Sequence, residues 1–220
     1  MEGLPQDPVQ FLGLAGGGGD ERARQIVAAA YDLLDEAGLE GLTIRAVLAR
    51  TGLARRAFYE CFSGKDDLVL AVFETTLRGA AQYYTALAER LGDPLETIRE
   101  IAQGIVLTRY GFEQDLGEAM DRRSAAMARE HLRLGETRPE ELQAALRPLL
   151  DLIAAQVREG IRTGQCREAD PDLQARLVYN LVATTAHTEL IAGDGGGSDR
   201  ERRRALAGSL WEFCRRAIAA

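Results

Sequence analysis

Two very short helical segments within residues 43–62 constrain the fold of this chain more than any other feature of its sequence. The first has apolar residues at spacings of three and four, and the run Thr51-Gly52-Leu53 interrupts it. The second is barely two turns long and carries Phe58 and Phe62 four residues apart, so both rings are expected to enter one small core. Two such segments joined by a tight, glycine-bearing turn are typical of a helix-turn-helix.

The rest of the chain from Asp20 onward also repeats its apolar residues at helical spacing, and no stretch alternates long enough to indicate a strand. We therefore expect an all-α fold. Asp20 and Thr43 are suitable helix caps, and Gly38 is expected to end the first helix. The expected helices cover residues 20–37, 43–50, 54–62, 65–90, 94–110, 113–120, 122–134, 139–163, 171–191 and 199–219.

This pattern predicts three regions. Residues 1–19 contain two prolines and a run of four glycines without an apolar face, so we expect a flexible N-terminal arm. The glycine run lacks the preceding strand and the closing Lys and Ser or Thr of a phosphate-binding loop. Residues 20–65 are expected to form the helix-turn-helix domain, and residues 66–220 a larger helical domain.

Charge is distributed unevenly along the chain. The net charge is −7, which taken alone argues against a nucleic-acid partner. Residues 45–65, however, contain four arginines and Lys65 against a single acid, Glu60, so this stretch carries +4. Lys65 is also the only lysine in the sequence. A basic stretch that coincides with a helix-turn-helix indicates DNA binding, although such a run on an unrelated bundle is ordinarily a solvated helix face.

Composition excludes several other classes of protein. With 46% hydrophobic and 28% charged residues the 220-residue chain is expected to be globular. It has no apolar run of about 20 residues that could cross a bilayer and no cationic start of a secretory signal, so we expect a cytoplasmic protein. The three cysteines, Cys61, Cys166 and Cys214, lack the close spacing of a metal or redox pair and are expected to be reduced thiols.

The second short helix is expected to lie in the major groove of duplex DNA. Burial of its phenylalanines leaves Arg55, Arg56, Tyr59 and Glu60 around the other faces. Arginine can bind guanine or phosphate, and a tyrosine hydroxyl can donate to phosphate. Glu60 is unfavourable beside a polyanion, and we expect it to pair with Arg56 one turn earlier and to hold that guanidinium in place.

The stretch TIRAVLARTGLARRAFYECFSGKDDL, residues 43–68, resembles the DNA-binding signature of TetR-family (tetracycline-repressor-like) transcriptional regulators. The resemblance extends from residue 21 to about residue 70. Its most specific positions are Thr43, Gly52, the Phe58-Tyr59 pair, Phe62, Lys65 and Leu68. It implies that Tyr59 and Lys65 touch DNA phosphates. We expect DNA contacts from Thr43, Arg45, Arg55, Arg56, Tyr59 and Lys65.

The chain departs from the family pattern at three positions. Ala54 stands where a serine or threonine commonly caps the recognition helix, a loss of order ~1 kcal/mol that leaves this helix open to fraying. Leu48 stands where a small residue is usual. Cys61 stands where a histidine is common, which puts one phosphate contact in doubt.

The resemblance also implies that the larger domain binds a small molecule and forms a homodimer on a palindromic operator. Helices 139–163 and 171–191 are the natural pair for a four-helix bundle with a second copy, unless both line the core of one protomer. A ligand would shift the long helix that begins at Lys65 and so lower operator affinity. The expected ligand-binding residues are polar or adaptable groups on otherwise apolar helices: Tyr84, Arg109, Tyr110, Met127, His131, Asn180, Thr184 and His187, with Tyr83 and Met120 as further candidates.

We expect no enzymatic activity, no metal and no cofactor. The spacing His187-Thr188-Glu189 matches part of a deaminase motif, but the Pro-Cys-x-x-Cys that completes that zinc site is absent. Structural or exposed roles are therefore expected for both histidines. Two alternatives to the regulator hypothesis stay open at this point. One is a helical small-molecule-binding protein whose DNA-binding unit has degenerated, and the other is a thiol redox sensor that acts through Cys61.

Overall fold

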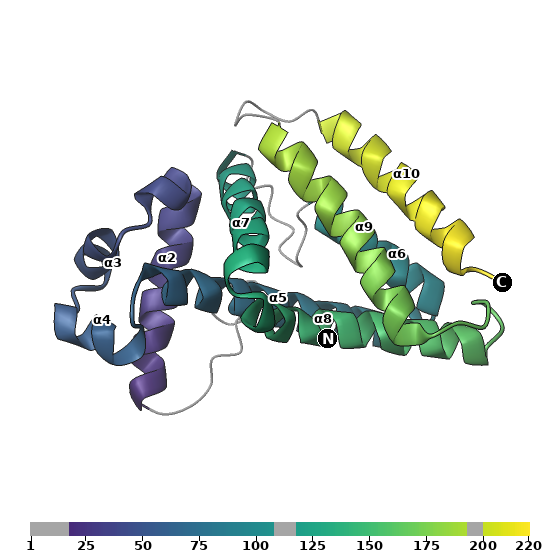
Figure 1. The fold of residues 1–220 in the computed structure, drawn as a ribbon, viewed down its shortest axis with the longest axis horizontal. Helices are drawn as coiled ribbons and strands as arrows, with labels where there is room; N and C mark the ends of the chain where they lie inside the picture. The colour runs from purple at the N-terminus through teal and green to yellow at the C-terminus, as the bar shows by residue number, and fades with distance from the viewer. Residues whose placement is uncertain (1–17, 108–117, 193–199) are drawn as a thin grey trace. The chain divides into compact units, whose positions relative to one another are not determined.

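The computed structural model of the protein describes residues 18–107, 118–192 and 200–220, and these ranges are almost entirely helical (Figure 1). Within them the only extended pairing is one antiparallel bridge between Cys166 and Ala219. The predicted all-α fold is confirmed. The helices are α2 (Gly18–Gly41), α3 (Ile44–Thr51), α4 (Arg55–Cys61), α5 (Lys65–Leu91), α6 (Pro94–Leu107), α7 (Glu118–Thr137), α8 (Pro139–Arg162), α9 (Pro171–Ala192) and α10 (Arg200–Ile218).

α2 begins two residues before the predicted start and continues beyond Gly38 to Gly41. At Gly38 the backbone leaves the helical region, with φ 61° and ψ −159°, a conformation that glycine adopts without steric cost. The predicted interruption is therefore present, but helical turns resume after it. The predicted apolar stripe is buried, with Ile26, Ala30 and Leu34 at most 1% exposed.

α3 and α4 have the predicted ends. The Thr43 side-chain oxygen accepts a hydrogen bond from the Ala46 backbone N–H at 3.1 Å, which caps α3. Gly52 ends α3 in the left-handed region, at φ 70°, and its N–H donates to the Leu48 carbonyl. Ala54 precedes α4 and provides no side-chain cap, as its chemistry requires.

One continuous helix, α7, occupies residues for which the sequence predicted two segments meeting near residue 121. That predicted boundary is wrong. No glycine or proline lies between residues 118 and 134, and buried Ala126, Ala128 and Leu134 continue one apolar face. The predicted helix end at residue 110 and the start at residue 113 lie outside the described residues.

The chain divides into two compact units. The first consists of Met1–Gly79 and Gln114–Ala145, and the second of Ala80–Glu113 and Leu146–Ala220. In the first unit, α2 packs against α3, α4 and α7. This division differs from the predicted domains, because α7 belongs with the helix-turn-helix rather than with the rest of the larger domain. The predicted domains at 20–65 and 66–220 are functional divisions and stay a prediction.

In the second unit, α6 packs against α9 and α10, and α9 against α10. Ile98 and Ile101 of α6, Val182 of α9 and Ile218 of α10 are at most 2% exposed. The backbone N–H of Arg167 donates to the Ile218 carbonyl at 3.0 Å, which fixes the end of α10 beside the segment between α8 and α9. None of the helices described is long and apolar enough to cross a membrane.

Candidate nucleic-acid interface

Phe58 anchors α4 in the first unit. Its side chain is 0% exposed, and its ring centroid lies 5.4 Å from that of Tyr59 and 5.8 Å from that of Phe62. Val47 of α3 is also fully buried. The prediction that both phenylalanines enter the core holds fully for Phe58, whereas Phe62 is half-buried. Burial of Phe58 fixes which face of α4 points outward.

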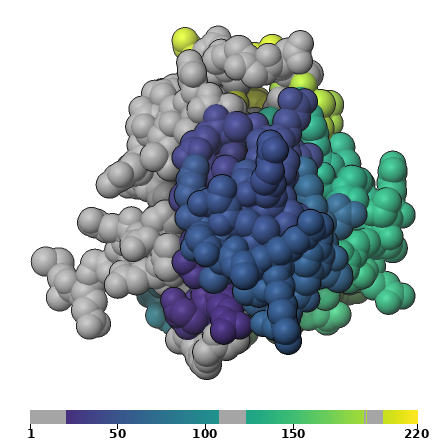
Figure 2. Space-filling model, turned by 90° about the vertical axis from the view of Figure 1, so that its left-hand side faces the viewer, coloured from purple at the N-terminus to yellow at the C-terminus, as the bar shows by residue number. Residues whose placement is uncertain are grey.

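The outward face of α4 carries Arg55, Arg56, Tyr59 and Glu60, all exposed as predicted. Figure 2 looks onto the surface formed by α3 and α4, shown in blue. The Arg55 guanidinium lies over the Tyr59 ring, 5.6 Å from its centroid, and its Nη2 is 3.4 Å from the Tyr59 hydroxyl. Arg56 Nε donates to Glu60 at 3.0 Å, so the predicted pair is confirmed.

The basic residues of α3 differ in what they can offer to DNA. Arg45 is exposed. Arg50 donates to Glu36 at 2.6 Å and to Asp32 at 3.5 Å, both on α2. The hydrogen bond from Arg50 lowers the pKa of Glu36 below its usual range. Two acids of α2 thus neutralise Arg50, and the positive charge of the face rests on the remaining basic residues.

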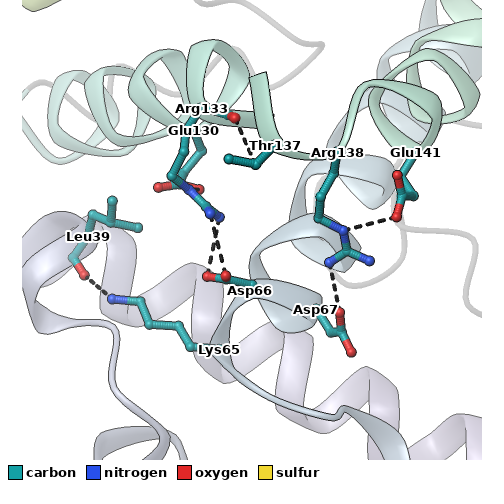
Figure 3. Close-up of polar contacts among 9 residues, drawn as sticks. All are labelled: Leu39, Lys65, Asp66, Asp67, Glu130, Arg133, Thr137, Arg138 and Glu141. Carbon is teal, nitrogen blue, oxygen red and sulfur yellow. Dashed lines mark hydrogen bonds and ion pairs between the residues drawn. The ribbon is translucent and has the colours of Figure 1, made fainter. Parts of the chain in front are cut away.

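Lys65 opens α5 and reaches back to α2 (Figure 3). Its ammonium Nζ donates to the Leu39 carbonyl at 2.9 Å, near the C-terminal end of α2, where carbonyl groups lack helical partners. Lys65 therefore joins two helices of the first unit. A lysine ammonium has three donors, and one of them is used here. The predicted phosphate contact of Lys65 is compatible with this position and stays a prediction.

The next two residues of α5, Asp66 and Asp67, bind arginines at the junction of α7 and α8 (Figure 3). Arg133 of α7 lies 3.2 Å from Asp66, and Arg138, between the two helices, lies 2.7 Å from Asp67. Asp67 also accepts hydrogen bonds from the hydroxyl and backbone N–H of Ser63. The Ser63 hydroxyl and Arg138 lower the pKa of Asp67. The first turn of α5 is thus tied to the α7–α8 junction.

A second connection joins α7 to α2. Arg123 of α7 lies 2.9 Å from Asp35 of α2, and its guanidinium stacks 5.5 Å from the centroid of the Tyr31 ring. The Tyr31 hydroxyl donates to the Val72 carbonyl at 3.2 Å and is hydrogen-bonded to the Thr76 hydroxyl. Burial raises the pKa of Tyr31 to about 12. Sequence reasoning missed these residues because partners up to 88 positions apart leave no local pattern.

The predicted ligand-binding residues are divided between the two units. Met127 and His131 belong to the first unit, whereas Tyr84, Asn180, Thr184 and His187 belong to the second. Tyr84 is buried against the ring of Tyr83, 5.1 Å away, and His187 is half-buried. Arg109 and Tyr110 lie outside the described residues, as does the side chain of Met120.

Three of these residues have surroundings that the structure describes, and their ligand-binding role stays a prediction. Asn180 and Thr184 are exposed on α9. The ring of His131 packs 5.7 Å from that of Phe73, and burial lowers the pKa of His131 to about 4. At neutral pH this half-buried histidine is uncharged and packs against Phe73, which agrees with the structural role expected for it. Across the described residues, no group of His, Cys, Asp or Glu is arranged to hold a metal ion.

Large apolar side chains stay exposed on the last two helices. Leu173 and Leu177 of α9 are 43% and 54% exposed, and Phe213 of α10 is 65% exposed. The stripe predicted for helix 139–163, in contrast, is buried within the chain, as Leu146, Leu149 and Ile153 show. The expectation that this helix presents its apolar residues to a second copy is therefore wrong.

Comparison with known proteins agrees with this geometry. Residues 26–72, from α2 into α5, match the family model described as bacterial regulatory proteins, tetR family. YezE of Bacillus subtilis, named as an uncharacterised helix-turn-helix transcriptional regulator, is 31% identical over 74 residues. That match spans 34% of this chain and only 38% of the length of YezE.

Solved structures of low sequence identity share the fold over most of the chain. A TetR-family transcriptional regulator from Pectobacterium atrosepticum is 23% identical with a TM-score of 0.70, covering 92% of this chain and 96% of its own. The structure of RolR in complex with resorcinol has 17% identity and a TM-score of 0.64, covering 89% and 88% of the two chains. The matched helix-turn-helix, with its Thr43 cap, Gly52 turn, buried Phe58 and Lys65 at the start of α5, identifies residues 26–72 as the DNA-binding domain of the tetR family of bacterial regulatory proteins.

Proposed function

We propose that this chain represses transcription as a homodimer on a palindromic operator and is released from it by a small molecule. The match of residues 26–72 to the tetR family model supports a DNA-binding transcriptional regulator. The observation that carries the proposal is the outward face of α4. Phe58 is fully buried beneath it, so Arg55, Arg56 and Tyr59 are held on the solvent side of a short helix. Such a helix fits the major groove, which is about 12 Å wide.

The DNA-binding part of this proposal is tested by removing single contacts to phosphate. Lys65→Ala is expected to weaken binding to every duplex by about tenfold. It is also expected to reduce the slope of log affinity against log salt by about 1, because the variant has one cation fewer and displaces fewer counterions from the DNA. Tyr59→Phe keeps the ring on Phe58 and removes only the hydroxyl. It is expected to weaken binding without changing the salt slope, because the hydroxyl is uncharged. Fluorescence anisotropy of labelled duplexes at several salt concentrations measures both.

Arg78→Ala is the matched control, since Arg78 is an exposed cation on α5, thirteen residues beyond Lys65 or about 20 Å along the helix. Thermal unfolding of Lys65→Ala shows whether loss of the hydrogen bond to Leu39 has destabilised the fold. This separates an effect on stability from loss of the contact to DNA phosphate. Equal salt slopes for wild type and Lys65→Ala contradict the phosphate assignment. No binding of the wild type even at low salt contradicts the regulator proposal and favours a ligand-binding protein with a degenerate DNA-binding unit.

The dimer part of the proposal rests on α9 and α10. The large apolar side chains that stay exposed in the described part of the second unit are Leu173, Leu177 and Phe213, together with Leu91 at the end of α5. Helices with an exposed apolar face pair with a second copy around a two-fold axis and form a four-helix bundle. A two-fold dimer in turn binds two half-sites of opposite orientation. We therefore keep α9, the predicted helix 171–191, in the dimer interface and replace the predicted helix 139–163 by α10.

The small-molecule part rests on the ion pairs at the start of α5. Arg133 and Arg138, at the α7–α8 junction, bind Asp66 and Asp67 in the first turn of α5. A molecule that moves α7 or α8 must therefore move or break these pairs. RolR, which shares the fold, has been solved with resorcinol, an example of a small organic ligand in such a protein.

Operator and effector must oppose each other by equal factors, because coupling between two sites is reciprocal. We expect a thermal-shift screen of small aromatic and aliphatic metabolites to give a molecule that lowers operator affinity at least tenfold, and we expect saturating operator to lower the affinity for that molecule by the same factor. In Arg133→Gln/Arg138→Gln this factor is expected to fall below threefold. If the double variant keeps the full factor, the ion pairs take no part in the coupling between effector and operator. The control is Arg162→Gln, at an exposed ion pair with Glu159 on α8.

A further inference from the structure

Glu60 is the one acidic residue of α4, and it is bound by arginines from two different helices. Its Oε1 accepts from Arg56 Nε of α4 at 3.0 Å, and its Oε2 accepts from Arg22 Nη1 of α2 at 3.1 Å. One carboxylate therefore engages one guanidinium with each oxygen. Arg22 was not among the predicted DNA contacts, because it lies 38 positions from Glu60 in the sequence.

These ion pairs contribute little to folding stability. The side chains of Glu60, Arg22 and Arg56 are 47%, 53% and 91% exposed. Exposed pairs of this kind typically contribute about 0–1 kcal/mol, since water screens the attraction and the side chains lose rotational freedom. A carboxylate on this face also repels DNA phosphate. A role in binding explains the arrangement better than a role in stability.

The geometry leaves both arginines able to bind a phosphate while they stay paired. Arg56 uses Nε toward Glu60, and its 91% exposed side chain leaves the two terminal nitrogens on the solvent side. Arg22 uses Nη1 alone. A guanidinium has five N–H donors in a fixed plane, so one edge can bind a carboxylate while another binds phosphate. Figure 2 shows the start of α2, in purple, exposed beside the blue surface of α3 and α4.

We propose that Glu60 is a positioning residue that joins Arg22 and Arg56 into one phosphate-binding clamp, and that Arg22 extends the DNA-binding surface from α4 onto α2. The inference rests on the proposed DNA-binding function. By holding two cations from two helices at one spacing, Glu60 favours the duplex geometry in which both reach the backbone. Its own negative charge weakens loose association with other DNA. Glu60 thus contributes to specificity at some cost in total affinity.

The test compares wild type, Arg22→Gln, Glu60→Gln, Glu60→Asp and the double variant Arg22→Gln/Glu60→Gln. Anisotropy titrations use an operator fragment selected from genomic DNA and a scrambled duplex of equal length, each at several salt concentrations. Arg22→Gln is expected to weaken binding to both duplexes about fivefold and to lower the salt slope by about 1. Glu60→Gln is expected to raise affinity for the scrambled duplex and to reduce the ratio of operator to scrambled affinity at least threefold.

Glu60→Asp keeps the charge but shortens the side chain. It is therefore expected to retain the low affinity for scrambled DNA, while its ratio of operator to scrambled affinity stays below that of the wild type. In the double variant, the effect of Arg22→Gln on the operator is expected to be smaller than in the wild-type background, because the clamp is already open. Arg78→Gln, which removes an exposed cation of α5, is the control for net charge.

Failure of the proposed function and failure of the clamp are distinguishable. If the wild type binds neither duplex at low salt, the proposed function fails. If the wild type binds the operator and Arg22→Gln retains its affinity and salt slope, Arg22 is not a contact and the clamp is overturned. If Glu60→Gln raises affinity for both duplexes by the same factor, Glu60 acts by repulsion alone and the positioning role is overturned.

Discussion

Phe58→Ala is expected to lower the free energy of unfolding of the α2–α4 region by about 3–5 kcal/mol, the range for truncating a fully buried aromatic side chain. The ring is 0% exposed and packs beside the rings of Tyr59 in α4 and of Phe62 directly after it. A short helix without a side-chain cap has little stability of its own, so the cavity cannot be repaired locally. The recognition helix is expected to lose its orientation, and operator binding is expected to be lost with it.

Hydrogen exchange measures this change better than a global melt, because the chain has two compact units and need not unfold in one step. Amide protection in α3 and α4 is expected to fall by about two orders of magnitude or more, since each factor of ten corresponds to about 1.4 kcal/mol. Leu132→Ala, at a 45% exposed leucine of α7 in the same unit, is the control and is expected to change protection little. Unchanged protection in Phe58→Ala means that α4 is held by something other than this ring.

Charged substitutions on the exposed apolar face are expected to dissociate the dimer. Leu177→Asp/Phe213→Asp places a carboxylate on each of α9 and α10, at side chains that are 54% and 65% exposed in one chain. Burying these charges in a symmetric interface brings like charges together without partners, which costs several kcal/mol. Sedimentation velocity at micromolar concentration is expected to show a dimer for wild type and a monomer for the variant.

Loss of the dimer has a large consequence for operator binding. In a dimer, the second half-site is bound within the same complex, so its effective concentration is in the millimolar range. A monomer lacks this advantage, and its affinity for a two-half-site operator is expected to be at least 100-fold lower. A single half-site fragment is expected to bind wild type and variant alike. Leu132→Asp, at the exposed leucine of the first unit, is the control for added charge. If Leu177→Asp/Phe213→Asp stays dimeric, the dimer interface does not lie on α9 and α10.

Local chemistry made the DNA-binding helices predictable from the sequence. Thr43 can cap only the helix that begins directly after it, Gly52 tolerates the left-handed turn, and the spacing of Phe58 from Phe62 decides which face of α4 is buried. Each of these effects acts within one or two turns of chain. The pairing of Arg56 with Glu60 was predictable for the same reason. Features that depend on residues close in sequence could be predicted without a structure.

Contacts between distant helices could not be predicted in this way. Nothing near Lys65 in the sequence indicates that its ammonium binds the Leu39 carbonyl, and nothing near Glu60 indicates Arg22. Amphipathic periodicity shows that a helix has an apolar face but not what covers it. That is why α8, whose stripe is buried within the chain, and α9, which keeps exposed leucines, were given the same role.

The position of Lys65 has a consequence for chemical modification of this protein. The chain has one lysine side chain, and its amine is engaged with the Leu39 carbonyl at the start of α5. Any acyl group transferred to a lysine of this chain must therefore arrive at this one place, where it removes the positive charge and displaces the hydrogen bond at once. A reagent selective for lysine amines is in effect a single-site reagent aimed at the joint between α2 and α5.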